Sequence, residues 1–361
     1  MNLRVGIVGL PNAGKSTLFN ALLQKQQALA ASYPFATIEP NVGIVPVPDQ
    51  RLMRLAEIVA KGNSNEENLP PIVPSVVEFY DIAGLVAGAH KGEGLGNKFL
   101  SHIREVELIV HVIRYFEDGN VVKTGKSPRD DFETVKTELI LKDLETLDKQ
   151  QEPKGKAEKE DKLRWEAIVK VKTGLEEGLQ ASEIILTEEE KELIAQLFLL
   201  TAKPAMFVLN VGEHDLNKIS QIEKEHSNWK PLVICAKLES ELVDFSETER
   251  REYFADNNLS ETGLDRLVGM AFEQLGLISF LTAGEKEVRS WTILKGTSAV
   301  NAAGVIHTDF EKHFISAQVA SFADFVRVGG WTEAKKLGLV RTEGREYVVR
   351  PDDVIEFMIG R

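Results

Sequence analysis

The residues best suited to chemistry form an octet close to the start of the chain, Gly9–Ser16, with the pattern G-x-x-x-x-G-K-S. Glycines in such a loop let successive backbone N–H groups point at one anion, and a helix that begins there adds the positive end of its dipole. We expect Lys15 to reach the β- and γ-phosphates of a nucleotide and the Ser16 hydroxyl to bind Mg²⁺. The octet therefore predicts a nucleoside-triphosphate site.

Two later segments are expected to complete the phosphate and metal site. Asp81-Ile82-Ala83-Gly84 reads D-x-x-G, which would put Asp81 on Mg²⁺ through water and the Gly84 N–H on the γ-phosphate. Thr37 precedes the second predicted strand, where a hydroxyl ligand for Mg²⁺ would come from. The glycine-rich run Gly88–Gly96 could order around the γ-phosphate and relax after hydrolysis. The predicted phosphate contacts are Asn12, Ala13, Gly14, Lys15, Ser16 and Thr17.

The base should be recognised after later strands, where guanine-specific P-loop proteins carry N-K-x-D. This chain has N-V-G-E from Asn210 to Glu213, so the carboxylate is one methylene longer and the lysine is missing. A longer side chain misplaces both acceptors for guanine, which should weaken the preference for that base. We expect base contacts from Asn210, Glu213 and the backbone of Val211, with the stem of Lys237 in the C-A-K segment lining the pocket.

The elements that must position these residues follow from the hydrophobic pattern. Short apolar segments alternate with helical patterns, which predicts a parallel sheet with right-handed crossovers. The predicted strands are Leu3–Val8, Val42–Val47, Val76–Asp81, Leu108–Ile113, Ala205–Asn210 and Leu232–Cys235. The alternation stops at residues 122–201, whose Lys, Glu and Leu content predicts an inserted helical hairpin with its tip at 151–156. A solvated helical pair without a partner is the alternative reading of this insertion.

The last 80 or so residues change character. Short strands separated by glycine turns predict a small α+β domain. The expected strands are Val288–Leu294, Ala317–Ala320, Arg345–Val349 and Val354–Ile359.

Bulk properties limit the classes of protein that remain. The chain has 361 residues and a formal net charge of −13, which argues against a generally basic surface. Cys235 is the single cysteine, so no internal disulfide can form and a reducing compartment is expected. We expect no leader and no membrane span, and therefore a cytoplasmic protein that is a monomer or a weak dimer.

In combination, GLPNAGKST, PFATIEPN, DIAGLVAGAHKGEGLGN, NVGE and CAK resemble the Obg-like ATPase family, also called the YchF family, within the translation-factor-related P-loop GTPases. AGEKEVRSWTI and AAGVIHTDFEKHFISAQV are similar to that family's TGS domain, a small ubiquitin-like fold. The resemblance covers essentially the whole chain. It implies an α/β, Ras-like G domain at 1–121 and 202–277, a coiled-coil hairpin at 122–201 and a TGS domain at 278–361. It also implies hydrolysis of ATP in preference to GTP, a role linked to translation or stress, and association with ribosomes or ribosomal RNA.

Hydrolysis needs a group that orients the attacking water. Many GTPases use a glutamine directly after D-x-x-G, but here that position is Leu85, which cannot form a hydrogen bond. The candidates are His90 in the glycine-rich run, His111 inside an apolar strand, and a bound K⁺, suggested by cation-stimulated relatives, with Asn12 as its ligand. We favour His111, because a buried imidazole requires a polar partner.

Three other functions stay open at this point. A GTP-specific translation factor would use Glu213 or Asp215 to read guanine. A small-molecule kinase would need an arginine-rich lid, which the sequence does not suggest. A ribosome or RNA adaptor would hold nucleotide only as a structural group, and its mixed surface charge predicts weak, salt-sensitive binding to free nucleic acid.

Overall fold

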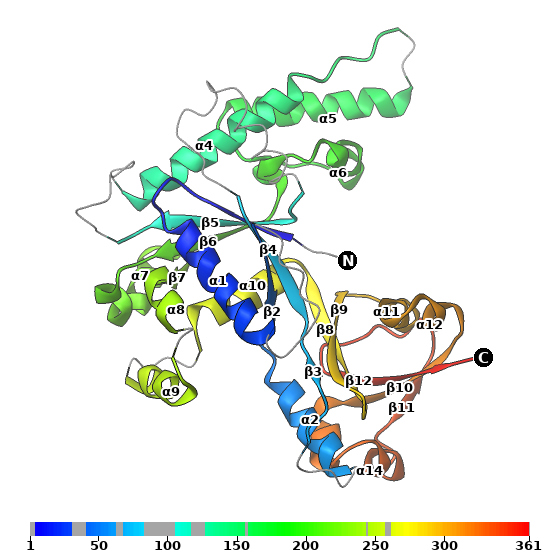
Figure 1. The fold of residues 1–361 in the computed structure, drawn as a ribbon. Helices are drawn as coiled ribbons and strands as arrows, with labels where there is room; N and C mark the ends of the chain where they lie inside the picture. Colours follow the sequence, from blue (N-terminus) through cyan, green and yellow to red (C-terminus); the bar gives the residue numbers. More distant parts are fainter. Residues whose placement is uncertain are drawn as a thin grey trace. The chain divides into compact units, whose positions relative to one another are not determined.

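A computed structural model describes residues 4–30, 41–62, 68–82, 105–116, 127–155, 158–242, 245–256 and 261–360. The chain divides into two compact units (Figure 1). The first comprises Met1–Val45 and Glu78–Leu267, and the second comprises Pro46–Val77 and Val268–Arg361. The domain boundaries expected from the sequence remain predictions.

The first unit is built on a six-stranded sheet with the order β2-β4-β1-β5-β6-β7. Its strands are β1 (Arg4–Val8), β2 (Val42–Pro46), β4 (Val76–Asp81), β5 (Leu108–Arg114), β6 (Ala205–Asn210) and β7 (Leu232–Ile234). Strand β1 pairs in parallel with β4 and β5, and the parallel pairing continues from β5 to β6 and β7. Because parallel strands end at one edge of a sheet, the loops that follow β1, β6 and β7 meet at that edge.

Helices flank this sheet. They are α1 (Lys15–Ala30), α7 (Ile219–Glu225), α8 (Ala236–Leu242) and α9 (Glu247–Asp256). Helix α10 (Gly263–Gln274) begins in the first unit and continues into the second. Figure 1 shows α1, which begins within the octet, beside α8. The buried carboxylate of Glu239 in α8 accepts the N–H groups of Gly263 and Leu264 and so caps the start of α10.

The predicted insertion contains two long helices, α4 (Pro128–Leu147) and α5 (Lys159–Glu176), followed by the short α6 (Glu188–Ile194) (Figure 1). Ser127 caps α4 by accepting the Asp130 N–H, and Pro at the first helical position supports this start. Asp143 is buried and accepts hydrogen bonds from the Leu200 and Thr201 N–H groups and the Thr201 hydroxyl. This carboxylate therefore fixes the chain that returns from α6 to the sheet.

The second unit contains a sheet with the order β11-β10-β12-β8-β9-β3. Its strands are β3 (Ile72–Val73), β8 (Leu277–Ala283), β9 (Val288–Leu294), β10 (Phe314–Ser321), β11 (Arg341–Glu343) and β12 (Asp353–Ile359). Its helices are α2 (Gln50–Gly62), α11 (Ala299–Ile306), α12 (Thr308–Lys312), α13 (Phe322–Val328) and α14 (Trp331–Lys336). Buried Leu55 of α2 and Phe325 of α13 share one core cluster with β8 and β12.

The strand predicted at Arg345–Val349 is wrong. The structure places β11 at Arg341–Glu343 and a turn after it, closed by a hydrogen bond from the Tyr347 N–H to the Gly344 carbonyl at 3.2 Å. The backbone of this segment pairs instead with the residues before and at the start of α11. The Val349 N–H donates to the Thr297 carbonyl, and the Tyr347 carbonyl accepts the Ala299 N–H.

Candidate functional site

The octet forms the predicted loop between a strand and a helix. Asn12 has a φ of +63° and Gly14 a φ of +93°, so the backbone turns sharply through left-handed conformations. The Ala13 N–H closes the turn on the Leu10 carbonyl at 3.3 Å. A Cβ atom at Gly14 would collide with the side-chain amide of Asn210. Glycine is therefore required at position 14 by both its backbone conformation and its neighbour.

Lys15 is held against this loop. Its ammonium donates a hydrogen bond to the Leu10 carbonyl at 2.8 Å, and only 7% of the residue is exposed. Burial lowers the pKa of Lys15, and the negative charge of Asp81 partly opposes that shift. The ammonium is thus a desolvated cation at the loop, and an incoming phosphate would offer it a stronger partner than a carbonyl.

Ser16 and Asp81 converge at the other side of the loop. The Ser16 hydroxyl donates to Asp81 Oδ2 at 3.5 Å, while Asp81 Oδ1 is buried and has no hydrogen-bond partner within the described residues. Burial raises the pKa of Asp81, opposed by the charge of Lys15 and the Ser16 hydrogen bond. The Ser16 hydroxyl and the Asp81 carboxylate both offer oxygen ligands, which Mg²⁺ prefers. The unsatisfied Oδ1 of Asp81 is suited to this role. The described residues contain no cluster of three His, Cys, Asp or Glu side chains for a metal, so water and phosphate would complete such a site.

Asn210 connects the phosphate loop to the loop after β7. Its side-chain amide donates to the Ala13 carbonyl at 2.9 Å, and its side-chain carbonyl accepts the Ala236 N–H at 3.0 Å. The side chain is buried. The sequence predicted a base contact for Asn210, but did not predict this bridge between residues far apart in the chain. The bridging amide positions two loops of the site with respect to each other.

Glu213 and Lys237 form an ion pair at 2.8 Å between Oε1 and Nζ. This pair lowers the pKa of Glu213 and raises that of Lys237, in both cases mainly through their hydrogen bond. Val211 lies between Asn210 and Glu213 in the sequence, but its side chain is buried and its N–H donates to the Ile234 carbonyl at 2.9 Å. The two charged side chains predicted for base recognition therefore meet, while Val211 anchors the strand end. The sequence spacing alone gave no signal for the ion pair.

His111 lies on β5, opposite Val8 of β1, and is buried among aromatic rings. The centroids of Phe132 and Phe207 lie 5.7 and 6.1 Å from the imidazole centroid. Burial, and to a lesser extent the charge of Lys15, lowers the pKa of His111 to about 3. The imidazole is consequently neutral at physiological pH and can exchange hydrogen bonds, but it is a weak base.

Of the remaining predicted site residues, the structure describes Thr17. Thr17 is exposed in the first turn of α1. Thr37, Gly84 and the alternative histidine His90 lie outside the described residues.

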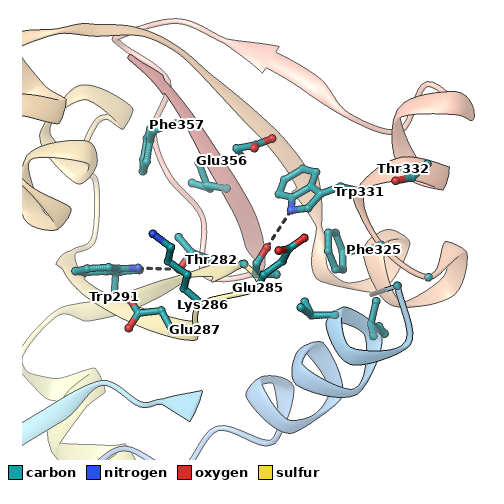
Figure 2. A pocket seen from close by; sticks show the side chains of 18 of the residues that line it. Thr282, Glu285, Lys286, Glu287, Trp291, Phe325, Trp331, Thr332, Glu356 and Phe357 are labelled. Atoms are coloured by element: carbon teal, nitrogen blue, oxygen red, sulfur yellow. Dashed lines mark hydrogen bonds between the residues drawn. The ribbon is translucent and has the colours of Figure 1, made fainter. Parts of the chain in front are cut away.

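A separate hollow of about 970 Å³ lies within the second unit (Figure 2). Trp291 and Trp331 line it, with their indole N–H groups bound to the Thr282 hydroxyl and the Ala283 carbonyl at 3.0 and 3.3 Å. Three of its glutamates form ion pairs, Glu287 with Arg289, Glu333 with Lys336 and Glu356 with Lys335. None of the predicted nucleotide-site residues that the structure describes lines it.

Family models match both parts of the chain. A model described as 50S ribosome-binding GTPase matches residues 4–157. A model for the C-terminal domain of YchF GTPases, described as a protein of unknown function, matches residues 277–360. Among the described residues, no helix has the length and apolar character needed to cross a bilayer.

Known relatives are similar to this chain over nearly its whole length. The chain is 46% identical over 371 residues to the ribosome-binding ATPase YchF of Bacillus subtilis, covering 99% of each chain. It is 45% identical to the ribosome-binding ATPase YchF of Escherichia coli O157:H7, covering 100% of each. Its fold is similar to the structure of the YchF GTPase of Schizosaccharomyces pombe, with a TM-score of 0.83, 35% identity, and coverage of 99% of this chain and 98% of that one.

Proposed function

The chain belongs to the YchF, or Obg-like ATPase, family, and from this premise we propose that it is a Mg²⁺-dependent ATPase that prefers ATP to GTP and acts as a switch at the ribosome. The observation that carries the proposal is the joined nucleotide site. Asn210 links the phosphate loop to the loop after β7, and the Glu213–Lys237 pair stands where guanine-specific proteins have N-K-x-D.

The chain's own residues explain how the triphosphate would be held. The backbone of Asn12–Thr17 surrounds the phosphates, and Lys15 exchanges the Leu10 carbonyl for phosphate oxygens. Ser16 and Asp81 would hold Mg²⁺, which would neutralise charge that develops on the phosphates. Oδ1 of Asp81 has no hydrogen-bond partner in the part of the chain that the structure describes, which supports this assignment. Thr37 and the Gly84 N–H are proposed to add a metal ligand and a γ-phosphate contact.

The choice of base follows from the ion pair. In N-K-x-D proteins the aspartate accepts two hydrogen bonds from guanine. Here Glu213 is longer and is bound to Lys237 at 2.8 Å, so guanine would have to break that pair to gain both hydrogen bonds. Adenine carries no N–H next to its exocyclic amine and does not need the aspartate geometry. The arrangement therefore favours ATP.

For hydrolysis, we assign the orientation of water to His111. Leu85 cannot provide that hydrogen bond. With a pKa of about 3, His111 is a neutral group that accepts or donates a hydrogen bond instead of withdrawing a full proton from water. K⁺ bound by Asn12 remains a second proposal for the same role, supported by the exposed position of Asn12 in the loop.

Binding to the ribosome would place the protein in the cytoplasm, and the names of its relatives support this partner. A monomer or weak dimer is part of the proposal. The test is steady-state hydrolysis of ATP and GTP with Mg²⁺ and with chelator, together with pelleting of the protein with purified 70S ribosomes in ADP and in a non-hydrolysable ATP analogue. Mg²⁺-dependent turnover of ATP and nucleotide-dependent pelleting are expected. Bound nucleotide without turnover would favour the adaptor, and turnover that needs an added acceptor metabolite would favour the kinase.

A further inference from the structure

The first helix of the insertion packs against the strand that carries His111. In Figure 1, α4 runs beside β5, and the two elements are in contact. Buried Val135 and Leu139 of α4 share a core cluster with Ile109 of β5. Ile109 and His111 lie two positions apart and so share one face of the strand. Phe132 precedes Val135 by three positions, which places it on the same face of α4, and its ring contacts His111.

His111, Phe132 and Phe207 form one group of aromatic contacts. The imidazole centroid lies 5.7 Å from the Phe132 centroid and 6.1 Å from the Phe207 centroid, and the two phenyl centroids are 5.4 Å apart. These distances lie in the range where aromatic rings attract each other. Phe207 is the register partner of His111 on the neighbouring strand β6. The sheet therefore supplies one phenyl ring, and the insertion supplies the other.

Phe132 is itself held by packing. The centroid of the Trp229 ring lies 5.2 Å from that of Phe132, with an angle of 34° between the ring planes. Both residues are half-buried and pack on the core cluster that β5, β6 and β7 share. A side chain that orients another must have its own conformation fixed by its neighbours. Phe132 meets this requirement.

The imidazole of His111 depends on these rings for its orientation. Among the described residues, none forms a hydrogen bond with its side chain. The imidazole nevertheless lies close to the phosphate loop. His111 pairs with Val8, which directly precedes Gly9, and the charge of Lys15 contributes to the lowered pKa of His111. Because a group that orients water must point in a defined direction, the ring contacts at this place bear on the reaction.

From these contacts we propose that Phe132 is a positioning residue for His111. The inference rests on the proposed role of His111 in hydrolysis. Phe132 holds the imidazole in the orientation in which it directs the attacking water, and its effect on the rate passes through that imidazole. The start of α4 therefore contributes to the chemical step, although this helix belongs to the insertion.

The test measures single-turnover hydrolysis of ATP by the full chain with Mg²⁺. Phe132→Leu keeps an apolar side chain but removes the ring. It should lower the rate constant of the chemical step about tenfold, which corresponds to about 1.4 kcal/mol, while ATP affinity stays within about twofold. Phe132→Tyr keeps the ring and should hydrolyse ATP at close to the parental rate.

Leu144→Ala is the matched control on the same helix. Leu144 is also half-buried, but it packs on the separate core cluster of α4 and α5. Its truncation should lower the urea unfolding midpoint and leave the rate of hydrolysis unchanged. A loss of rate in Leu144→Ala as large as that in Phe132→Leu would mean that the effect is a general loss of α4 stability, and would overturn the proposal.

A double-mutant cycle shows whether Phe132 acts through His111. In the His111→Phe background, Phe132→Leu should cause no further loss of rate, because the group that it positions is gone. ¹H–¹³C spectra of the nucleotide-free protein report on the contact independently of turnover. The C–H signals of the His111 ring, assigned by their absence from His111→Phe, should move in Phe132→Leu because the ring current of Phe132 is lost. They should stay in place in Leu144→Ala.

The outcomes separate this inference from the proposed function. Parental hydrolysis by Phe132→Leu, with slow hydrolysis by His111→Phe, would overturn the positioning role and leave the proposed function intact. Additive losses in the double variant would also overturn it, because Phe132 would then act by another route. Unchanged His111 signals in Phe132→Leu would show that the two rings do not touch. Parental hydrolysis by His111→Phe would remove the role of His111, and that of Phe132 with it.

Discussion

The side-chain amide nitrogen of Asn210 lies 2.9 Å from the backbone carbonyl oxygen of Ala13, although 197 positions separate the two residues. The same side chain accepts the Ala236 N–H. The phosphate loop and the loop after β7 are therefore joined by one buried side chain. Preorganisation of this kind reduces the entropy that binding must overcome.

Replacing Asn210 tests this connection. Asn210→Ala leaves the Ala13 carbonyl and the Ala236 N–H without partners in a buried place, which should lower the free energy of unfolding by about 2–4 kcal/mol. It should also weaken ATP binding, because the two loops lose their common anchor. Urea unfolding and ATP titration measure the two effects. A variant with normal stability and normal ATP affinity would show that the bridge is dispensable.

Gly14 and Gly155 form a matched pair of positive-φ glycines. Their φ angles are +93° and +77°, but a Cβ at Gly14 collides with Asn210, whereas one at Gly155 meets no atom of the described residues within 4 Å. Alanine at either site should incur a backbone penalty of about 1 kcal/mol. Gly14→Ala alone should additionally displace Asn210 and reduce ATP affinity at least tenfold in a titration. Equal affinities for the two variants would contradict the contact argument.

His111 makes stability depend on pH. The pKa of its imidazole is about 3 in the folded chain and about 6.5 when unfolded. Between these values the unfolded state binds a proton that the folded state does not, so stability falls as the pH falls from 7 toward 3. Between pH 7 and pH 5, the natural chain should lose about 2 kcal/mol more than His111→Phe, which cannot titrate. Urea unfolding at both pH values checks this, and identical losses would mean that the imidazole is not buried as described.

The same substitution tests the proposed role of His111 in hydrolysis. Phe fits the aromatic environment of Phe132 and Phe207, so ATP affinity should be retained. If His111 orients the attacking water, kcat should fall about 100-fold with little change in KM. Single-turnover hydrolysis with ³²P-labelled ATP measures the chemical step. Hydrolysis at the parental rate would remove His111 from the mechanism.

Much of the first unit could be predicted from the sequence. Strands at Val76–Asp81 and Ala205–Asn210 were predicted with the bounds that the structure shows, because buried parallel strands are short apolar runs. The octet is also typical of a loop between a strand and a helix, and this prediction is confirmed by β1 and α1. The predicted family membership and fold class are confirmed by the relatives.

The side-chain contacts of the site and parts of the second unit could not be predicted, because they depend on contacts between residues far apart in the sequence. The Asn210–Ala13 bridge and the Glu213–Lys237 pair arise only when the sheet brings distant loops to one edge. The short segment Arg345–Val349 after a glycine turn predicted a strand, but its backbone forms hydrogen bonds with the residues before and at the start of α11 instead. Likewise, no local signal shows that residues 46–77 pack with the C-terminal unit.

The most direct test of the account is titration of the nucleotide-free protein with ATP and GTP in the presence of Mg²⁺, beside the Glu213→Asp variant. The account predicts tighter binding of ATP by the natural chain. It also predicts a smaller preference in Glu213→Asp, because the shorter carboxylate releases Lys237 and approaches the geometry that guanine requires. Equal or tighter binding of GTP by the natural chain would contradict the account and support a GTP-specific translation factor.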